Sequence, residues 1–154
     1  MNVTREPVWH MGSLFRWLAT ARDTNGAFSL AEVEVRAGGE PPPHRHTNED
    51  ESFYVLDGEI DFIVDGKVTR ARPGELVFLP RGRTHAFLVA TARARALLHI
   101  SPAGLEDAFL ETSERAPRAE LPPLPDGPPP REVIERVLSI HGARGVSYEL
   151  GGAR

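Results

Sequence analysis

The chain contains no cysteine, so neither a disulfide framework nor a thiolate metal site is possible. Any metal ion must therefore be held by imidazole and carboxylate groups. Lysine is almost absent as well: Lys67 stands alone among 18 basic residues, a bias that suggests a GC-rich bacterial coding sequence. The formal charge is -4 and no basic run occurs, so we expect no binding to nucleic acid or anionic lipid.

Long apolar segments are also missing. No stretch approaches the length that spans a bilayer, and the N-terminal residues lack the apolar core of a secretory signal. We therefore expect a cytoplasmic protein with no membrane partner. A length of 154 residues with 40% hydrophobic content suits one domain with a substantial core.

From about residue 8 to residue 101, short runs of Val, Ile, Leu and Phe alternate with turn signals. These signals are Asn25-Gly26, Gly38-Gly39, Asp57-Gly58, Asp65-Gly66 and Pro73-Gly74. In one run Ile60, Phe62 and Val64 alternate with Asp61, the pattern of a strand with one buried face. Strands at this spacing indicate an all-β sandwich or barrel, and we assign residues 1–101 to it.

The character of the chain changes after residue 101, and residues 102–154 are interpreted as a C-terminal extension. Ser101-Pro102 can cap and begin a helix over roughly 103–114. Residues 117–130 hold seven of the fourteen prolines and predict an extended strap over the barrel surface.

A second short helix is predicted from Arg131 to about His141, with Gly142 as the stop signal. Its apolar stripe is expected to pack on the barrel or on a partner subunit. The stripe consists of Val133, Ile134, Val137 and Leu138.

Four residues with metal-binding side chains are spaced so that they can meet in a β-sandwich. His44 and His46 are two apart, so on a strand both imidazoles point to one face. Glu51 follows closely enough to return on a neighbouring strand, and His85 comes after the turn at residues 80–82. Glu49 has the same parity as Glu51 and remains a rival oxygen ligand. Three imidazoles and a carboxylate suit one divalent iron, manganese, cobalt, nickel, copper or zinc ion.

These residues resemble the first motif of the cupin superfamily. That motif is Gly, five residues, His-x-His, three or four residues, Glu, six residues and Gly. Here Gly38, His44, His46, Glu51 and Gly58 match it without a gap.

The second cupin motif is Gly, five residues, Pro-x-Gly, two residues, His, three residues and Asn. Gly74, Pro80, Gly82 and His85 match it, whereas Val89 replaces the final Asn. The resemblance spans roughly residues 28–101 and implies a jelly-roll β-barrel. It also implies that His44, His46, Glu51 and His85 bind the metal.

The predicted barrel supplies an apolar pocket beside this site. Phe53, Phe62 and Phe87 fall on inward parities, while Phe28 and His99 are further candidates whose parity is ambiguous. These five residues form the predicted substrate pocket, which suits a flat or aromatic organic molecule. Two other histidines are expected at the surface: His10, which can lie near the barrel mouth, and His141, which has no other metal-binding or catalytic residue near it in the sequence.

Within the cupins, the segments at residues 23–35, 42–60, 79–87 and 101–109 resemble single-domain proteins grouped with flavonol (quercetin) dioxygenases. That resemblance implies that Glu51 also accepts the proton of an enol or phenol substrate, which then reacts with dioxygen. The same ligands also support a non-oxidative isomerase, cyclase, dehydratase or decarboxylase, and a non-catalytic small-molecule binder remains a further alternative. Exposed sheet edges favour a homodimer.

Overall fold

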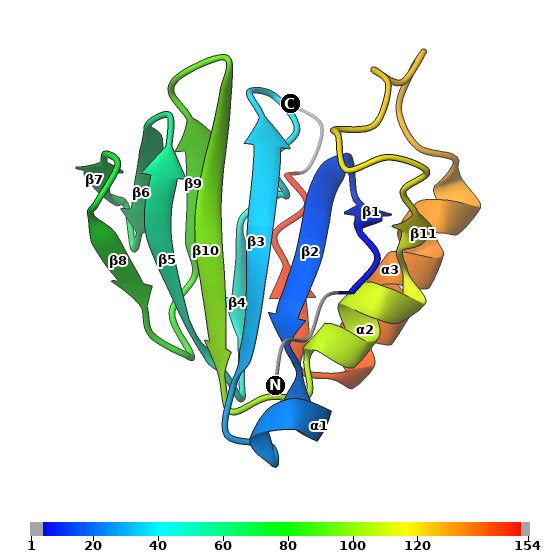
Figure 1. Cartoon of the computed structure of the whole chain (residues 1–154), viewed down its shortest axis with the longest axis horizontal. Coiled ribbons are helices and arrows are strands. Elements are labelled where there is room, and N and C mark those ends of the chain that lie inside the picture. The colour runs from blue at the N-terminus through cyan, green and yellow to red at the C-terminus, as the bar shows by residue number, and fades with distance from the viewer. Residues whose placement is uncertain (1–4, 152–154) are drawn as a thin grey trace.

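The computed structural model describes residues 5–151 and consists mainly of two antiparallel β-sheets (Figure 1). The larger sheet has seven strands in the order β11-β1-β2-β3-β10-β5-β8. The smaller has five, in the order β12-β4-β9-β6-β7. The predicted jelly-roll architecture is thus confirmed.

Most strands lie between residues 8 and 101, as predicted. The strands of the larger sheet are β1 (Val8–His10), β2 (Ser13–Ala19), β3 (Ser29–Arg36), β5 (Asp50–Asp57), β8 (Leu76–Leu79), β10 (Arg93–Ser101) and β11 (Glu114–Arg115). Those of the smaller sheet are β4 (His44–His46), β6 (Ile60–Val64), β7 (Lys67–Ala71), β9 (His85–Val89) and β12 (Val146–Tyr148). A short helix, α1 (Ala21–Thr24), separates β2 from β3.

The core lies between the two sheets and follows the alternation of the strands. In β6, Ile60 and Phe62 are buried, while Asp61 faces out and forms an ion pair with Arg70. The β6–β7 hairpin turns at Asp65-Gly66, where both residues have positive φ, as a two-residue turn of this kind requires.

The segment after β10 differs from its prediction. The expected helix over 103–114 is shorter, forming α2 (Glu106–Glu111), and Ser101 is the last residue of β10 rather than a helix cap. Gly104 has φ +127, which no helix accommodates, so the helix begins after it. The buried Glu106 carboxylate fixes this turn by accepting hydrogen bonds from the backbone N–H groups of Ala21 and Gly104.

The remaining extension covers one end of the larger sheet (Figure 1). Residues 117–130 contain no helix or strand and run along the surface, where the carbonyl of Glu120 accepts a hydrogen bond from Trp9 Nε1. Both sheets gain a strand from this part of the chain, because β11 pairs with β1 and β12 pairs with β4. The extension is therefore built into the sandwich.

The second predicted helix is α3 (Arg131–Ala143), which continues through Gly142. Its buried residues are Val137 and His141, whereas Val133 and Ile134 are exposed. The predicted stripe is thus displaced towards the C-terminal half of the helix. No helix within residues 5–151 is long and apolar enough to cross a membrane.

Strand β8 forms one edge of the larger sheet and exposes Leu76 and Phe78. An exposed apolar edge is a surface that oligomers commonly cover. A homodimer therefore stays a prediction.

Candidate metal centre

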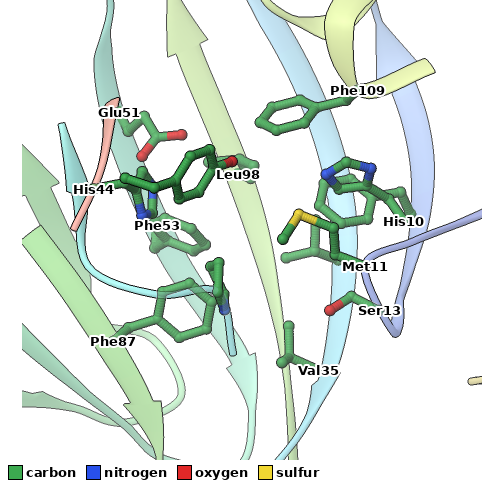
Figure 2. Close-up of a pocket in the computed structure, with 14 residues that line it drawn as sticks. His10, Met11, Ser13, Val35, His44, Glu51, Phe53, Phe87, Leu98 and Phe109 are labelled. Carbon is green, nitrogen blue, oxygen red and sulfur yellow. The ribbon is translucent and has the colours of Figure 1, made fainter. Parts of the chain in front are cut away.

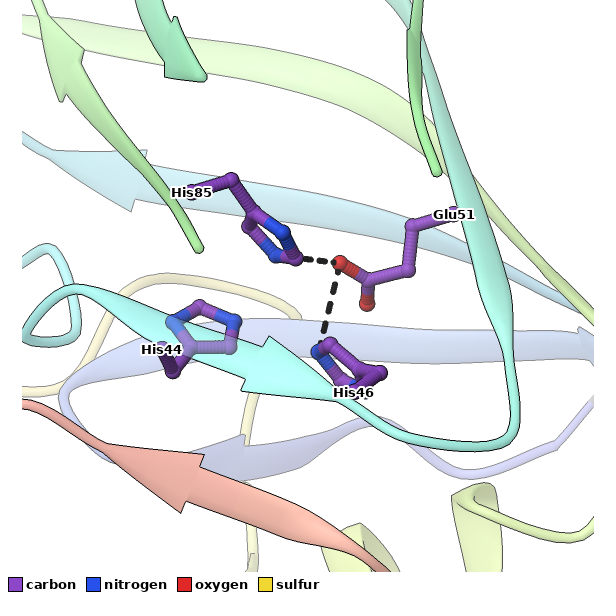
Figure 3. Close-up of side chains that lie close together, drawn as sticks. All are labelled: His44, His46, Glu51 and His85. Atoms are coloured by element: carbon purple, nitrogen blue, oxygen red, sulfur yellow. Dashed lines mark ion pairs between the residues drawn. The ribbon is translucent and has the colours of Figure 1, made fainter. Parts of the chain in front are cut away.

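The three histidines of the candidate site come from neighbouring strands of the smaller sheet. His44 and His46 lie on β4, and His85 on β9 is the direct cross-strand partner of His44. Figure 3 shows the three rings converging on the Glu51 carboxylate. Glu51 lies on β5, which belongs to the larger sheet. Glu51 therefore reaches the histidines across the sandwich, rather than from a neighbouring strand as expected.

The four side chains form a compact buried group. All four residues are less than a tenth exposed, and one ligand-type atom from each lies within 4.8 Å of the others. Glu51 Oε2 lies 3.1 Å from His85 Nε2 and 3.5 Å from His46 Nε2. The group can therefore hold one metal ion.

Hydrogen bonds on the far side of two rings fix which nitrogen is available to a metal. His44 Nδ1 lies 2.9 Å from the carbonyl of Pro42, and His85 Nδ1 lies 3.2 Å from the carbonyl of Arg83. A carbonyl oxygen only accepts, so both Nδ1 atoms carry the proton and both Nε2 atoms present a lone pair. The Nε2 atoms of His46 and His85 are buried and have no hydrogen-bond partner among residues 5–151. A cation bound between these atoms and the Glu51 carboxylate would give each of them a partner.

Glu49 does not belong to this group. Its Oε2 atom lies 3.8 Å from Nδ1 of His46, on the opposite side of the ring from Glu51. This is an ion-pair distance and not a hydrogen bond, so Glu49 acts on the ring through its charge, which favours the protonated form of His46 and increases the basicity of the ring. The structure therefore assigns the oxygen ligand to Glu51 and the supporting position to Glu49.

The charges of the group are strongly coupled. Burial alone would raise the pKa of Glu51, but the three histidines outweigh it and lower the pKa to about 2. Burial lowers the pKa of His44 to about 4, against the opposing charge of Glu51. For His46, burial lowers the pKa, but the carboxylates of Glu51 and Glu49 outweigh it and raise the pKa above 6.5. A proton on His46 can thus occupy the place of a cation.

A cavity of about 60 Å³ opens beside the group. His44 and Glu51 line one side, and Figure 2 shows His10, Met11 and Phe109 facing them from the other side. Most of the remaining lining is apolar. The site thus combines a cation-binding group with a largely apolar wall.

The predicted pocket residues divide into those that line the cavity and those that do not. Phe53 and Phe87 line it. Phe62 is fully buried behind them, with ring centroids 5.2 Å from Phe53 and 6.1 Å from Phe87. Phe28 and His99 do not line it and instead lie against each other, 5.2 Å apart. The alternation of β10 buries Leu98 and Ile100, which turns His99 to the other face.

Two residues line the cavity although they were not predicted to do so. His10, expected at the surface, is only 4% exposed. Tyr148 lies on β12 directly opposite His44, with ring centroids 5.4 Å apart. Neither belongs to a motif, and no pattern in the sequence pairs the C-terminal strand with β4.

Comparison with known proteins relates part of the chain to a sequence family. The sequence family described as the cupin domain matches residues 31–100. A quercetin 2,3-dioxygenase of Bacillus subtilis is 26% identical over 99 residues, which are 64% of this chain and 29% of that protein. An acetate kinase EutQ of Clostridioides difficile is 48% identical over 42 residues, covering 27% of each chain. The matches thus span less than a third of these relatives.

Solved structures support the same fold. KdgF from a Halomonas species superposes with a TM-score of 0.56 at 20% identity, over 62% of this chain and 85% of that one. At this identity the likeness concerns the fold alone.

Proposed function

Because this chain belongs to the cupin superfamily and buries a three-histidine, one-glutamate group beside a cavity, we propose that it is a metal-dependent enzyme acting on a small organic ligand. Its substrate would be enolisable or aromatic and would bind through oxygen. Our first candidate for the reaction is a dioxygenase-type oxygenation, which the likeness to the quercetin dioxygenase supports. The observation that carries the proposal is the position of Glu51, which belongs to the ligand group and also lines the cavity.

The residues present suit a first-row divalent ion. Nitrogen and carboxylate donors of this number are a common set for such ions, and the Nδ1 hydrogen bonds of His44 and His85 orient their rings for it. When bound, such an ion supplies positive charge to polarise a ligand oxygen and, if it is redox-active, supports oxidation.

Glu51 has a second role in this proposal. Among residues 5–151 it is the only acidic side chain that lines the cavity. An enol or phenol entering the cavity therefore meets one carboxylate able to accept its hydroxyl proton. The apolar wall formed by Phe53, Phe87 and Leu98 excludes water from that transfer.

The size of the cavity bears on the choice of substrate. At about 60 Å³ it is well below the roughly 300–1,000 Å³ of sites for drug-sized ligands. A small ligand fits it directly, whereas a flavonol requires a side chain of the lining to move. Met11 is 39% exposed and flexible, so it is the lining residue best suited to move.

Oxygen consumption tests the proposal. Purified protein is analysed for its metal content, loaded with each first-row divalent ion in turn, and mixed with quercetin or with smaller enolisable ketones and phenols in an oxygen electrode. We expect uptake that depends on the metal and is abolished by Glu51→Gln. The adjacent Asp50→Asn is the control, because Asp50 pairs with Arg81 on the surface. Oxygen uptake that Glu51→Gln leaves unchanged would refute the assignment.

A non-oxidative reaction is the second candidate, and one observation favours it. Tyr148 and Glu51 line the same cavity, so one ligand can be held by the hydroxyl oxygen of Tyr148 while the Glu51 carboxylate accepts its proton, without dioxygen. Turnover of the same compounds under strict anaerobiosis would select this candidate over the first.

A further inference from the structure

A second polar cluster adjoins the candidate metal centre and consists of residues outside the segment 31–100 that matches the family. It contains His10 on β1, Thr112 after α2, His141 on α3 and Tyr148 on β12. His10 and His141 are buried, and their rings stack with centroids 5.4 Å apart. The terminal parts of this chain thus add a polar cluster to the cupin core.

The pairing of β12 with β4 places Tyr148 at the candidate metal centre. Val146 pairs with His46 and Tyr148 with His44, so both β12 side chains share the face of the two histidines. The Tyr148 ring contacts His44, and its hydroxyl lies 2.7 Å from His141 Nδ1. Tyr148 therefore connects the candidate metal centre with the second cluster.

The hydrogen bonds of Thr112 determine the tautomer of His141. Thr112 Oγ1 lies 2.8 Å from the carbonyl of Ala108, and two oxygens this close require a proton between them. The single hydroxyl proton of Thr112 is therefore committed to Ala108. His141 Nε2, 3.1 Å from the same Oγ1 atom, must then carry a proton and donate it.

The tautomer of His141 in turn fixes the Tyr148 hydroxyl. Burial lowers the pKa of His141 to about 4, so its ring is neutral and Nδ1 presents a lone pair. Tyr148 must then donate its proton to Nδ1. The phenol oxygen makes no other hydrogen bond within the described chain, so its lone pairs are free to accept one.

We propose that Tyr148 is a ligand-contacting residue that His141 and Thr112 hold as a hydrogen-bond acceptor, selecting ligands with a hydroxyl or amine group beside their metal-bound oxygen. This inference rests on the proposed metal-dependent function, because it takes the ligand to be bound at the metal. His141 and Thr112 are positioning residues in it, since they act through Tyr148. Selection arises because a ligand without a donor leaves the Tyr148 oxygen unpaired in a partly buried place.

The tautomer of His141 can be measured without any metal or ligand. Nitrogen-15 correlation spectra of the metal-free protein at about pH 8, where neutral imidazoles prevail, distinguish protonated from unprotonated ring nitrogens. The His141 signals are assigned by their loss in His141→Gln. We expect His141 to be protonated at Nε2, and His44 and His85 at Nδ1. Thr112→Ser should keep the proton of His141 on Nε2, whereas Thr112→Val should give a mixture of rings protonated at Nε2 and at Nδ1. A His141 ring protonated at Nδ1 in the unaltered protein would overturn the inference.

Ligand binding tests the selection itself. The probes are glycolate, which carries a hydroxyl, and methoxyacetate, which replaces that hydroxyl with an ether. Each is titrated into cobalt-loaded protein and followed by the visible absorption of the ion. Tyr148→Phe should weaken glycolate binding about 2- to 12-fold, as expected for one hydrogen bond, and should leave methoxyacetate binding unchanged or stronger, because the unpaired phenol oxygen is removed.

The control is Tyr54→Phe, because Tyr54 is the only other tyrosine and is 40% exposed, outside the cavity lining. It should change neither affinity. Equal effects of Tyr148→Phe on both probes, or no effect, would overturn the selection, as would a failure of glycolate to bind the cobalt-loaded protein. Failure of cobalt to bind would instead refute the proposed function, and the tautomer of His141 would still decide whether Tyr148 is held as an acceptor.

Discussion

Three consecutive carboxylates, Glu49, Asp50 and Glu51, have three different surroundings and give a sharp test of the candidate metal centre. Glu51 lies among the Nε2 atoms, Glu49 lies behind His46, and Asp50 pairs with Arg81 at 2.7 Å on the surface. Changing each carboxylate to its amide preserves shape and removes one charge. The three variants should therefore differ in metal binding.

The size of the effect follows from linkage between binding and folding. An ion at about 100 times its Kd stabilises the protein by about 2.7 kcal/mol. For a chain of 154 residues this is a rise in Tm of roughly 5–11 °C. Loss of a supporting carboxylate such as Glu49 costs up to about 10- to 100-fold in affinity, which leaves at least about 0.4–1.4 kcal/mol at the same ion concentration. Loss of Glu51, the only anionic ligand, should cost at least as much as the upper end of that range.

Differential scanning calorimetry with and without zinc measures these increments. We expect the full increment for the unaltered protein and for Asp50→Asn, a reduced increment for Glu49→Gln, and about 2 °C or less for Glu51→Gln. Asp50→Asn should lower the metal-free Tm slightly through loss of its ion pair, worth at most about 1 kcal/mol, and should leave the zinc increment unchanged. A full increment in Glu51→Gln, or a lost one in Asp50→Asn, would refute the assigned ligands.

Three further predictions concern pH and two structural positions. The pKa of His46 is raised, so at a pH below this pKa a metal ion must displace the proton of His46 in order to bind. The affinity for zinc should therefore fall by up to about tenfold per pH unit below this pKa and stay constant above it. Calorimetric titration in two buffers would count the proton released. Gly58→Ala should destabilise the protein by more than about 2 kcal/mol in urea unfolding, since Gly58 has φ +75 and a Cβ there would overlap the carbonyl of Arg93. Glu106→Gln should cost about 1–3 kcal/mol in the same assay without changing zinc binding. The two carboxylate oxygens of Glu106 accept from the backbone N–H groups of Ala21 and Gly104, and the glutamine side chain has only one acceptor oxygen for them.

The metal ligands could be predicted from sequence because their positions are encoded locally. A two-residue spacing places His44 and His46 on one face whatever the strand pairs with, and both are buried while Arg45 is exposed. The sheet to which Glu51 belongs could not be predicted, because a short loop can lead either to the next strand or across the sandwich. The pairing of β5 with β8 and β10 decides this, and it depends on residues far along the chain.

The pocket was harder to predict than the ligands because two kinds of side chain share the inward face. Phe62 and Phe87 have the same inward parity, yet Phe87 lines the cavity and Phe62 fills the core behind it. Parity selects the face of a strand, but depth along the sandwich separates a cavity wall from core packing. That depth depends on which strands lie opposite, as the contact between Phe53 and Phe62 shows.

The second cluster could not be predicted for a related reason, because it depends on how β12 pairs with β4. Only three residues of β12 pair with β4, and a shift of one residue would turn Tyr148 away from His44. The register is fixed at its two ends, where Thr47 N–H donates to the carbonyl of Gly145 and Glu149 N–H donates to the carbonyl of Pro43. These bonds involve the backbone, so they constrain the side chain at position 148 very little. The residue there can therefore change without altering the metal ligands, which makes β12 a place where ligand preference can change independently of metal binding.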